Sequence, residues 1–283
     1  MAVFYNQATL SYQGGTVNSN VAAGELLDAF SAEKTAVSAD YSPGSSVIYV
    51  LSLVNSGVSP LTGIAVSDDL GGYLFDGNSV WPLSYVAGSL TYFVGGAQQP
   101  ADALTISAGP PLTVSGITIP AGGNAMLIYE AQATAFAPMG PGAQITNTAT
   151  LTGAGTDITA QATVPARSDA MLTVNKAISP QTVTGNERLT YTFTILNSGA
   201  AAADAADAVT LTDTFDPVLS DLAVTLGSSV ATLSADYTYD EATGAFATVP
   251  GVLTVPAATF AQTAEGQWVT TPGVTVVTVE GTV

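Results

Sequence analysis

Apolar and polar residues alternate in short runs along most of the chain. Residues 46–57 read SVIYVLSLVNSG, residues 124–134 read NAMLIYEAQAT and residues 189–199 read LTYTFTILNSG. A period of two places the apolar side chains on one face of a β-strand, and Gly, Pro and Asn-Ser-Gly between the runs are typical of turns. The stretch GAAAADAADA at 199–208 has helical propensity, but it lies between two expected strands and we interpret it as a loop. The pattern predicts an all-β chain of sandwich domains.

The alternating runs form two repeats, with 142 residues between Lys34 and Lys176. The Asn-Ser-Gly turns at 55–57 and 197–199 keep this spacing, and three extra residues separate the next matched pair. Self-similarity over such a long period indicates tandem domains. We therefore expect two tandem Ig-like β-sandwich domains, at residues 26–167 and 168–283. The further matched positions are Asp68 with Asp213 and Glu130 with Glu280.

The second repeat stops before its pattern is complete. After Glu130 the first repeat continues through Asn147 and a last strand pair to about residue 165, whereas three residues follow Glu280. The opening residues 3–12, VFYNQATLSY, align without a gap with QITNTATLTG at 144–153, which places Asn6 opposite Asn147. We therefore predict that domain 2 lacks its last strands and that residues 1–25 are a donor-strand segment carrying the missing pattern.

A donor strand needs one apolar face, and the opening residues have one. An incomplete sandwich exposes an unpaired edge, which a strand from another molecule can cover through main-chain hydrogen bonds. If the segment completes domain 2 of a neighbour, the contact is head to tail and does not close, which produces fibres. The expected inward residues of the donor strand are Phe4, Asn6, Ala8 and Leu10.

Two alternatives to strand donation are also compatible with the alignment. The segment can fold back onto domain 2 of its own chain, because a linker of about 20 residues reaches about 60–70 Å when extended. The similarity between two strands rich in Thr and Ala can also arise by chance. The ungapped match, together with a domain that lacks this strand, favours donation.

Each repeat places a lysine, an acid and an asparagine on apolar strand faces. Lys34 alternates with Ala32 and Ala36, and Lys176 alternates with Leu172, Val174 and Ile178. The other residues expected on inward faces are Asp68 and Asn147 in domain 1, and Asp213 and the donated Asn6 in domain 2.

This combination suggests a chemical reaction. Burial favours the neutral forms of lysine and of a carboxylic acid, and a neutral amine is a nucleophile. The amine can attack an asparagine amide while the acid transfers a proton to the departing ammonia, leaving a Lys–Asn isopeptide bond. We expect Lys34 to bond to Asn147 with Asp68 assisting. Lys176 would bond to Asn6 of the next subunit with Asp213 assisting.

Glu130 and Glu280 are rival candidates for the catalytic acid. The alternation of their strand does not decide the point, since Leu127 and Tyr129 are equally good candidates for the inward set. The non-covalent alternative is a hydrogen-bonded Lys–Asp pair capped by the asparagine, or a lysine whose amine reaches out to solvent.

Composition removes several classes of function. The chain has 22 acidic and 4 basic residues, a net charge of −18, which disfavours binding to nucleic acid or to an anionic membrane surface. It has no cysteine and no histidine, so disulfides and the commonest general base and metal ligand are absent. The acidic turns 68–78 and 236–244 lack EF-hand spacing, and we interpret them as hairpin turns. We expect no cofactor and no metal.

The start of the chain, MAVFYNQATLSYQGG, lacks the basic and continuous apolar regions of a signal peptide. No uncharged apolar run is long enough to span a membrane, so membrane insertion is not expected. These features predict synthesis in the cytosol without a signal peptide.

Both repeats resemble a bacterial surface repeat, the domain of unknown function eleven. The segments are EKTAVSADYSPGSSVIYVLSLVNSG, VSDDL and ITNTATLTG in the first repeat, and NKAISPQTVTGNERLTYTFTILNSG and LTDTF in the second. The resemblance implies Ig-like sandwiches on cell envelopes. It matches the family's Lys, Asp and Asn to Lys34, Asp68 and Asn147, and to Lys176 and Asp213 in a repeat that lacks the Asn strand. The two-repeat chain also resembles clostridial endospore-appendage subunits.

Together these features predict a structural subunit of an extracellular fibre on a spore or cell surface. Its partner would be itself, in a head-to-tail homopolymer, with other appendage or spore-coat proteins as further candidates. The alternative is a monomeric adhesive or ligand-binding surface module with both domains closed internally. An enzyme such as a glycan hydrolase would need paired carboxylates in a cleft, and no motif indicates one. We expect no enzymatic activity beyond the self-directed bond.

Overall fold

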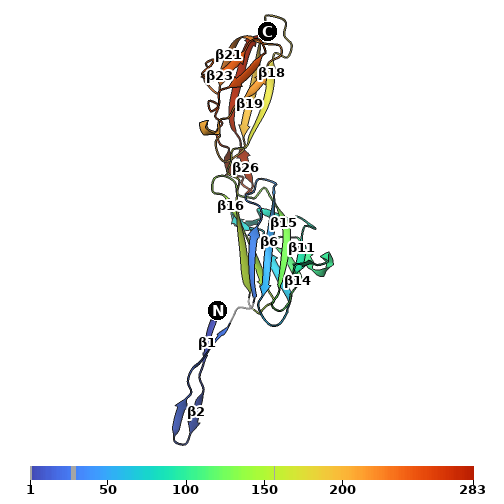
Figure 1. Cartoon of the computed structure of the whole chain (residues 1–283), viewed down its shortest axis with the longest axis vertical. Coiled ribbons are helices and arrows are strands. Elements are labelled where there is room, and N and C mark those ends of the chain that lie inside the picture. Colours follow the sequence, from blue (N-terminus) through green and yellow to red (C-terminus); the bar gives the residue numbers. More distant parts are fainter. Residues whose placement is uncertain (1, 27–29, 156) are drawn as a thin grey trace.

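The computed structural model describes residues 2–26, 30–155 and 157–283. Residue 1 of the expected donor segment and residues 27–29 at the start of the expected first domain lie outside the described residues. Apart from two short 3-10 helices, Ala101–Ala103 and Ala205–Asp207, all described elements are strands. The prediction of an all-β chain with tandem sandwich domains is confirmed, and the second 3-10 helix lies in the expected loop 199–208 (Figure 1). In the described part of the chain, no helix has the length and apolarity needed to cross a membrane.

Domain 1 is a sandwich of two antiparallel sheets. The first sheet has the order β12-β11-β15-β6-β5, with β10 also paired to β15, and the second has the order β13-β14-β7-β16-β17. The first sheet contains β5 (Phe30–Ala36), β6 (Ser46–Asn55), β10 (Leu83–Tyr85), β11 (Thr91–Val94), β12 (Ala97–Gln98) and β15 (Asn124–Ala133). The second contains β7 (Leu61–Asp68), β13 (Thr105–Ser107), β14 (Leu112–Ile119), β16 (Gln144–Thr152) and β17 (Ile158–Pro165).

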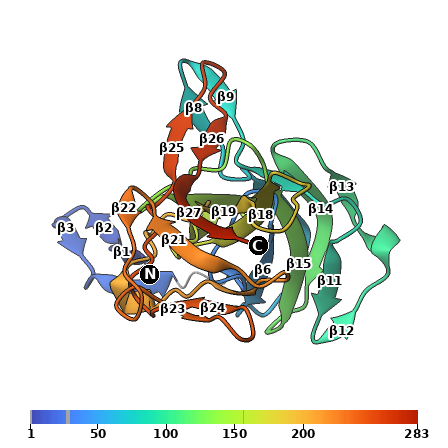
Figure 2. The ribbon, with the colours of Figure 1, turned by 90° about the horizontal axis from the view of Figure 1, so that it is seen from above.

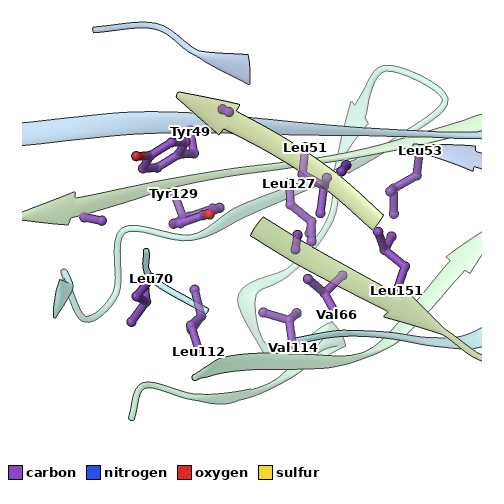
Figure 3. Packing of buried hydrophobic residues seen from close by; sticks show 14 of the residues in the cluster. Tyr49, Leu51, Leu53, Val66, Leu70, Leu112, Val114, Leu127, Tyr129 and Leu151 are labelled. Carbon is purple, nitrogen blue, oxygen red and sulfur yellow. The ribbon is translucent and has the colours of Figure 1, made fainter. Parts of the chain in front are cut away.

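The core of domain 1 lies between these sheets. In β6 every second residue is buried, as the alternating run predicted. Figure 3 shows Tyr49, Leu51 and Leu127 from one sheet facing Val66 and other apolar side chains from the second sheet. Burying each such side chain contributes about 1.5–3 kcal/mol, so the alternation itself selects which face of the strand turns inward.

Domain 2 repeats the first sheet but only part of the second. The five-stranded sheet has the order β18-β19-β27-β21-β22 and the three-stranded sheet has the order β20-β24-β23. Their bounds are β18 (Leu172–Ser179), β19 (Arg188–Asn197), β20 (Thr212–Thr214), β21 (Ser220–Leu226), β22 (Ser229–Val230), β23 (Tyr237–Asp240), β24 (Ala245–Thr248) and β27 (Gly273–Thr282).

The part of domain 2 that is missing corresponds to β16 and β17. Strand β7 is paired on both sides, with β14 and β16, whereas β20 is paired only with β24 among the described residues. In domain 1 the strand β17 also lies against β5. Within residues 168–283 no strand takes these two places, as the second repeat predicted.

The missing strands leave an apolar face of domain 2 open. All residues of β18 are exposed, including Leu172, Val174 and Ile178, which were expected to face inward. Val174 is 54% exposed, whereas Lys34 in the matching strand of domain 1 is 4% exposed. This exposure agrees with the predicted lack of the last strands of domain 2, because no strand within residues 168–283 covers the inward face of β18.

A hairpin of domain 2 contacts domain 1. It is formed by β25 (Thr259–Gln262) and β26 (Trp268–Thr271), which lie beside the β8 (Tyr73–Phe75) and β9 (Asn78–Val80) hairpin of domain 1 in Figure 2. The amide N–H of Trp268 donates to the carbonyl of Ala135 at 2.7 Å, and the side chain of Gln262 donates to the Tyr73 hydroxyl at 3.3 Å. These bonds connect the two domains directly.

The N-terminal segment is a free-standing antiparallel ribbon. It contains β1 (Ala2–Asn6) paired with β4 (Ala22–Leu26), and β2 (Thr9–Tyr12) paired with β3 (Gly15–Asn18). Figure 1 shows it projecting from the end of domain 1 that is opposite domain 2. Its apolar side chains are exposed, with Phe4 at 57% and Leu10 at 69%.

The tip of this ribbon has the same register as the last two strands of domain 1. Leu10 pairs with Val17 as Leu151 pairs with Ile158, with both partners shifted by 141 residues. Beyond the tip the two registers differ by one residue, because Asn6 pairs with Ala22, one residue further along the returning strand than the register of the tip requires. One extra residue in the returning strand causes this shift, as in a β-bulge. The expectation of one continuous strand over residues 3–12 is therefore wrong, since Gln7 and Ala8 interrupt it.

Candidate functional site

Four buried polar side chains meet in the core of domain 1. Lys34 on β5 and Tyr129 on β15 come from one sheet, while Asp68 on β7 and Asn147 on β16 come from the other. Their exposed fractions are 4%, 3%, 1% and 0%, respectively. We call this cluster the domain 1 site. Three of its members are the lysine, acid and asparagine that the sequence singled out.

Asp68 is the centre of the domain 1 site. Its Oδ2 accepts a hydrogen bond from Lys34 Nζ at 2.6 Å and a very short one from the Tyr129 hydroxyl. Its Oδ1 accepts from the Leu70 amide at 3.1 Å. The Tyr129 hydroxyl in turn accepts from Asn147 Nδ2 at 3.4 Å. A chain of polar contacts therefore runs from the amine through the acid and the phenol to the amide nitrogen.

The site contains buried polar atoms without hydrogen-bond partners. Asn147 Oδ1 has none among the described residues. The Tyr49 hydroxyl lies beside Asn147 but also makes no hydrogen bond of normal geometry within the described chain. Leaving one such group unpaired costs about 1–3 kcal/mol, so the site is not arranged for stability alone.

The surroundings disfavour the charged forms of both the Lys34 amine and the Tyr129 phenol. Burial lowers the pKa of Lys34, and the nearby Asp68 carboxylate opposes this shift only in part. The Lys34 Nζ lies 4.9 Å from the centre of the Tyr49 ring and 5.9 Å from that of Tyr129. Burial also raises the pKa of Tyr129 well above its usual value. The labelled rings of Tyr49 and Tyr129 lie side by side in Figure 3.

Sequence reasoning missed Tyr129. It appeared only as a possible inward residue in a strand of ambiguous alternation. The structure resolves the ambiguity, because Leu127 and Tyr129 are buried while Glu130 is only half-buried. The missing information was the register of β15 against the other strands of the sheet that carries Lys34.

Glu130 and Glu280 are removed as candidate acids. Strand alternation turns both side chains away from the core, since their neighbours Tyr129 and Val279 point inward. The side chain of Glu280 forms a short ion pair with Arg188 on the surface, where the two are 44% and 47% exposed. The expectation that either glutamate shuttles the proton is wrong for this reason.

Domain 2 holds an open version of the same arrangement. Lys176 Nζ makes a short ion pair with Asp213 Oδ2 and lies 4.5 Å from the ring centre of Tyr191. The lysine therefore points toward the core, as predicted, but its side chain is 41% exposed and that of Asp213 is 19% exposed. Asn6 lies in the exposed ribbon, so one chain does not bring it to Lys176.

The acidic turns use their carboxylates locally. Asp69 accepts hydrogen bonds from the amides of Gly71 and Thr148, both through Oδ1. Asp240 accepts from the Ala242 amide and the Thr243 hydroxyl, and the Ala242 bond in particular lowers its pKa. Among the described residues, no group of three or more potential ligands is arranged to hold a metal ion.

No family model and no curated protein match the chain, so the resemblance to the surface repeat remains a prediction. Several solved structures are similar in shape. BcpA, the major pilin subunit of Bacillus cereus, is 11% identical with a TM-score of 0.36, over 95% of this chain and 73% of that chain. The pilus backbone RrgB from Streptococcus pneumoniae is 10% identical with a TM-score of 0.36, over 86% and 55%.

A collagen-binding domain from a Staphylococcus aureus adhesin is 16% identical with a TM-score of 0.31, over 47% of this chain and 96% of that domain. Similarities this distant do not assign a function, which must come from the sites themselves.

Proposed function

We propose that this chain is a structural subunit of an extracellular fibre on a cell or spore surface. The subunits assemble head to tail when the N-terminal ribbon of one copy completes domain 2 of the next. The observation that carries the proposal is the match between the two extra strands of the ribbon and the two strands that domain 2 lacks. The ribbon has the tip register of β16 and β17, and these are the two strands without a counterpart in residues 168–283.

The open face of domain 2 supports this assembly. Val209, Leu211 and Asp213 are partly exposed, whereas their counterparts Ile64 and Val66 are buried. Together with the exposed apolar residues of β18, they form an apolar surface beside an unpaired strand edge. Such surfaces are typical of binding sites for an added strand. The exposed Phe4 and Leu10 of the ribbon provide apolar side chains to cover it.

Donation to a neighbour fits the geometry better than folding back. The ribbon ends at Leu26 and domain 1 begins its first strand at Phe30, a stretch that reaches about 14 Å when extended. The ten-residue strand β6 alone is about 33 Å long. Folding back onto domain 2 of its own chain, which lies at the opposite end of domain 1 in Figure 1, would therefore require the ribbon to reverse its direction within this short stretch and run along domain 1.

We also propose that Lys34 and Asn147 form an isopeptide bond within domain 1. The burial of the site, the lowered pKa of the amine and the contact with Asp68 support this reaction. A cross-link that closes a loop of about 100 residues stabilises a fold by about 4.7 kcal/mol in the loop-entropy description of disulfides. Lys176 and Asn6 of the next subunit form the corresponding bond at the junction, assisted by Asp213.

The assembly is tested with the full chain and a chain lacking residues 2–25, compared by sedimentation velocity over a range of concentrations. We expect the full chain to form species that grow with concentration and the shortened chain to remain a monomer. Adding the shortened chain to the full chain should shorten the polymers, because it caps one end. A full chain that stays monomeric at every concentration contradicts the proposal and favours the monomeric surface module.

The same samples, denatured, test the chemistry through their intact masses. The shortened chain should be one ammonia lighter than calculated because of the Lys34–Asn147 bond, and its Lys34→Ala variant should have the full calculated mass. Multimers of the full chain should lose one further ammonia for each Lys176–Asn6 junction. Wild-type chains at full mass would disprove the isopeptide bond and leave the strand donation to stand alone.

A further inference from the structure

The two lysine sites differ at one inward position. Tyr129 pairs across the ladder with Tyr49 on the neighbouring strand, and Val279 pairs with Tyr191. Tyr49 and Tyr191 are 142 residues apart, the repeat spacing that also relates Lys34 to Lys176. Val279 therefore occupies in domain 2 the place that Tyr129 occupies in domain 1. The apolar side chain can neither donate nor accept a proton.

Tyr129 lies between the acid and the leaving group. Its hydroxyl contacts Asp68 Oδ2 on one side and Asn147 Nδ2 on the other. Nδ2 is the nitrogen that departs as ammonia when the side-chain amide is attacked. Among the described hydrogen bonds of Asn147, the one to Tyr129 is the only contact that connects this nitrogen to the acid.

We propose that Tyr129 is a catalytic residue that relays the proton from Asp68 to the departing nitrogen of Asn147. The inference rests on the proposed isopeptide bond. It also implies that domain 2, with Val279, forms its junction bond more slowly than domain 1 forms its internal one.

The relay balances in atoms and protons. Asp68 first takes a proton from Lys34, which leaves a neutral amine and a carboxylic acid. The Nζ–Cγ bond to Asn147 then forms, and the amine passes one more proton to the acid as Asp68 passes its own to the Tyr129 oxygen. Tyr129 gives its hydroxyl proton to Nδ2, the Cγ–Nδ2 bond breaks, and ammonia leaves. The products are one amide, one ammonia, a neutral Asp68 and a restored Tyr129.

The raised pKa of Tyr129 agrees with this role, since the phenol stays protonated and able to donate at neutral pH. General acid–base relays of this kind accelerate reactions by about 100-fold to 10,000-fold. Removing the hydroxyl should therefore slow the bond by at least about 100-fold while the amine, acid and amide remain in place.

The experiment follows intact mass with time after fresh purification for wild type, Tyr129→Phe and Lys34→Ala, all as full chains. Tyr85→Phe serves as the matched control, because it removes another tyrosine hydroxyl from domain 1. The readout is the mass of the monomer, which carries no junction bond, and we expect wild type and Tyr85→Phe to be one ammonia short at the first time point. The Tyr129→Phe monomer should begin at full mass and convert slowly, and the Lys34→Ala monomer should stay at full mass.

The outcomes separate the two proposals. Wild type at full mass means that the bond itself is absent. Wild type and Tyr129→Phe that are equally short at the earliest time overturn the relay and leave the bond intact. If Tyr129→Phe fails to fold, the relay is tested instead with Val279→Tyr, which introduces the matching tyrosine into domain 2. It should accelerate the junction bond between Lys176 and Asn6, and an unchanged rate overturns the relay.

Discussion

At the scale of single residues, the cost of the domain 1 site indicates its purpose. Burying Lys34 and Asp68 together costs several kcal/mol in desolvation, and apolar residues of similar volume often serve stability as well or better. The unpaired amide oxygen of Asn147 adds a further cost. The proposed reaction between the lysine and the asparagine would remove the buried amine, so these costs would fall only on the unreacted site.

The unreacted site should make stability depend on pH. In Asn147→Ala the bond cannot form, and Lys34 keeps its lowered pKa. Between that pKa and the usual 10.5, the unfolded chain binds more protons than the folded one, so the free energy of unfolding rises with pH. The rise is at most about 1.4 kcal/mol per pH unit.

The measurement is urea unfolding of Asn147→Ala between pH 6 and about 9, below the range of tyrosine ionisation. The reference is the same variant with Lys34→Met and Asp68→Asn added, which removes the titrating pair. We expect the stability difference between the two proteins to grow with pH. A difference that is constant or shrinks would show that burial does not lower the pKa of Lys34 into this pH range.

At this scale the sequence identified three of the four residues. The two-residue period was enough to place Lys34, Asp68 and Asn147 on inward faces. It could not place Tyr129, because the strand around it alternates equally well on either face. To decide which face of that strand turns inward, its pairing with β6 must be known, and this pairing depends on contacts between residues far apart in the chain.

At the scale of secondary-structure elements, identical patterns give different burial. Strands β5 and β18 carry matched lysines, yet Lys34 is buried and β18 is exposed along its whole length. The sequence of a strand determines which face is apolar, but the neighbouring strands determine whether that face is covered. The sequence predicted the missing cover from the short second repeat. It did not predict the bulged register of the ribbon or the hairpin of β25 and β26 that contacts domain 1.

Two exposed valines in domain 2 test which face of it binds the ribbon. Val174 on β18 is 54% exposed and lies on the face left open by the missing strands, whereas Val274 on β27 is 49% exposed and belongs to another strand. Replacing either by lysine should change the stability of the monomer by no more than about 1 kcal/mol.

Only Val174→Lys should prevent assembly in sedimentation velocity, because the donated ribbon would bury an unpaired charge at a cost of about 3–5 kcal/mol. Val274→Lys should assemble like wild type. Assembly that is equally insensitive to both substitutions would mean that the β18 face is not the acceptor.

At the scale of the whole molecule, the chain is elongated, and the proposed donor ribbon and the proposed acceptor face of domain 2 lie at opposite ends. The ribbon projects from one end of domain 1, and domain 2 continues from the other (Figure 1). The hairpin of β25 and β26 fastens the domains through hydrogen bonds to domain 1. A contact between unlike ends of a rod repeats without closing, which is the geometry of a fibre. The net charge of −18 opposes the lateral clumping of such rods.

The most direct test of this account is a cysteine cross-link, which the chain suits because it has no cysteine of its own. In domain 1, Leu151 pairs with Val66, and the matching intersubunit pair is Leu10 with Leu211. We predict that Leu10→Cys combined with Leu211→Cys gives a ladder of disulfide-linked multimers on a non-reducing denaturing gel. The control combines Leu10→Cys with Val58→Cys, at a highly exposed position of domain 1, and should give no ladder. A cross-linked monomer would show that the ribbon folds back, and a ladder no stronger than the control's would contradict strand donation.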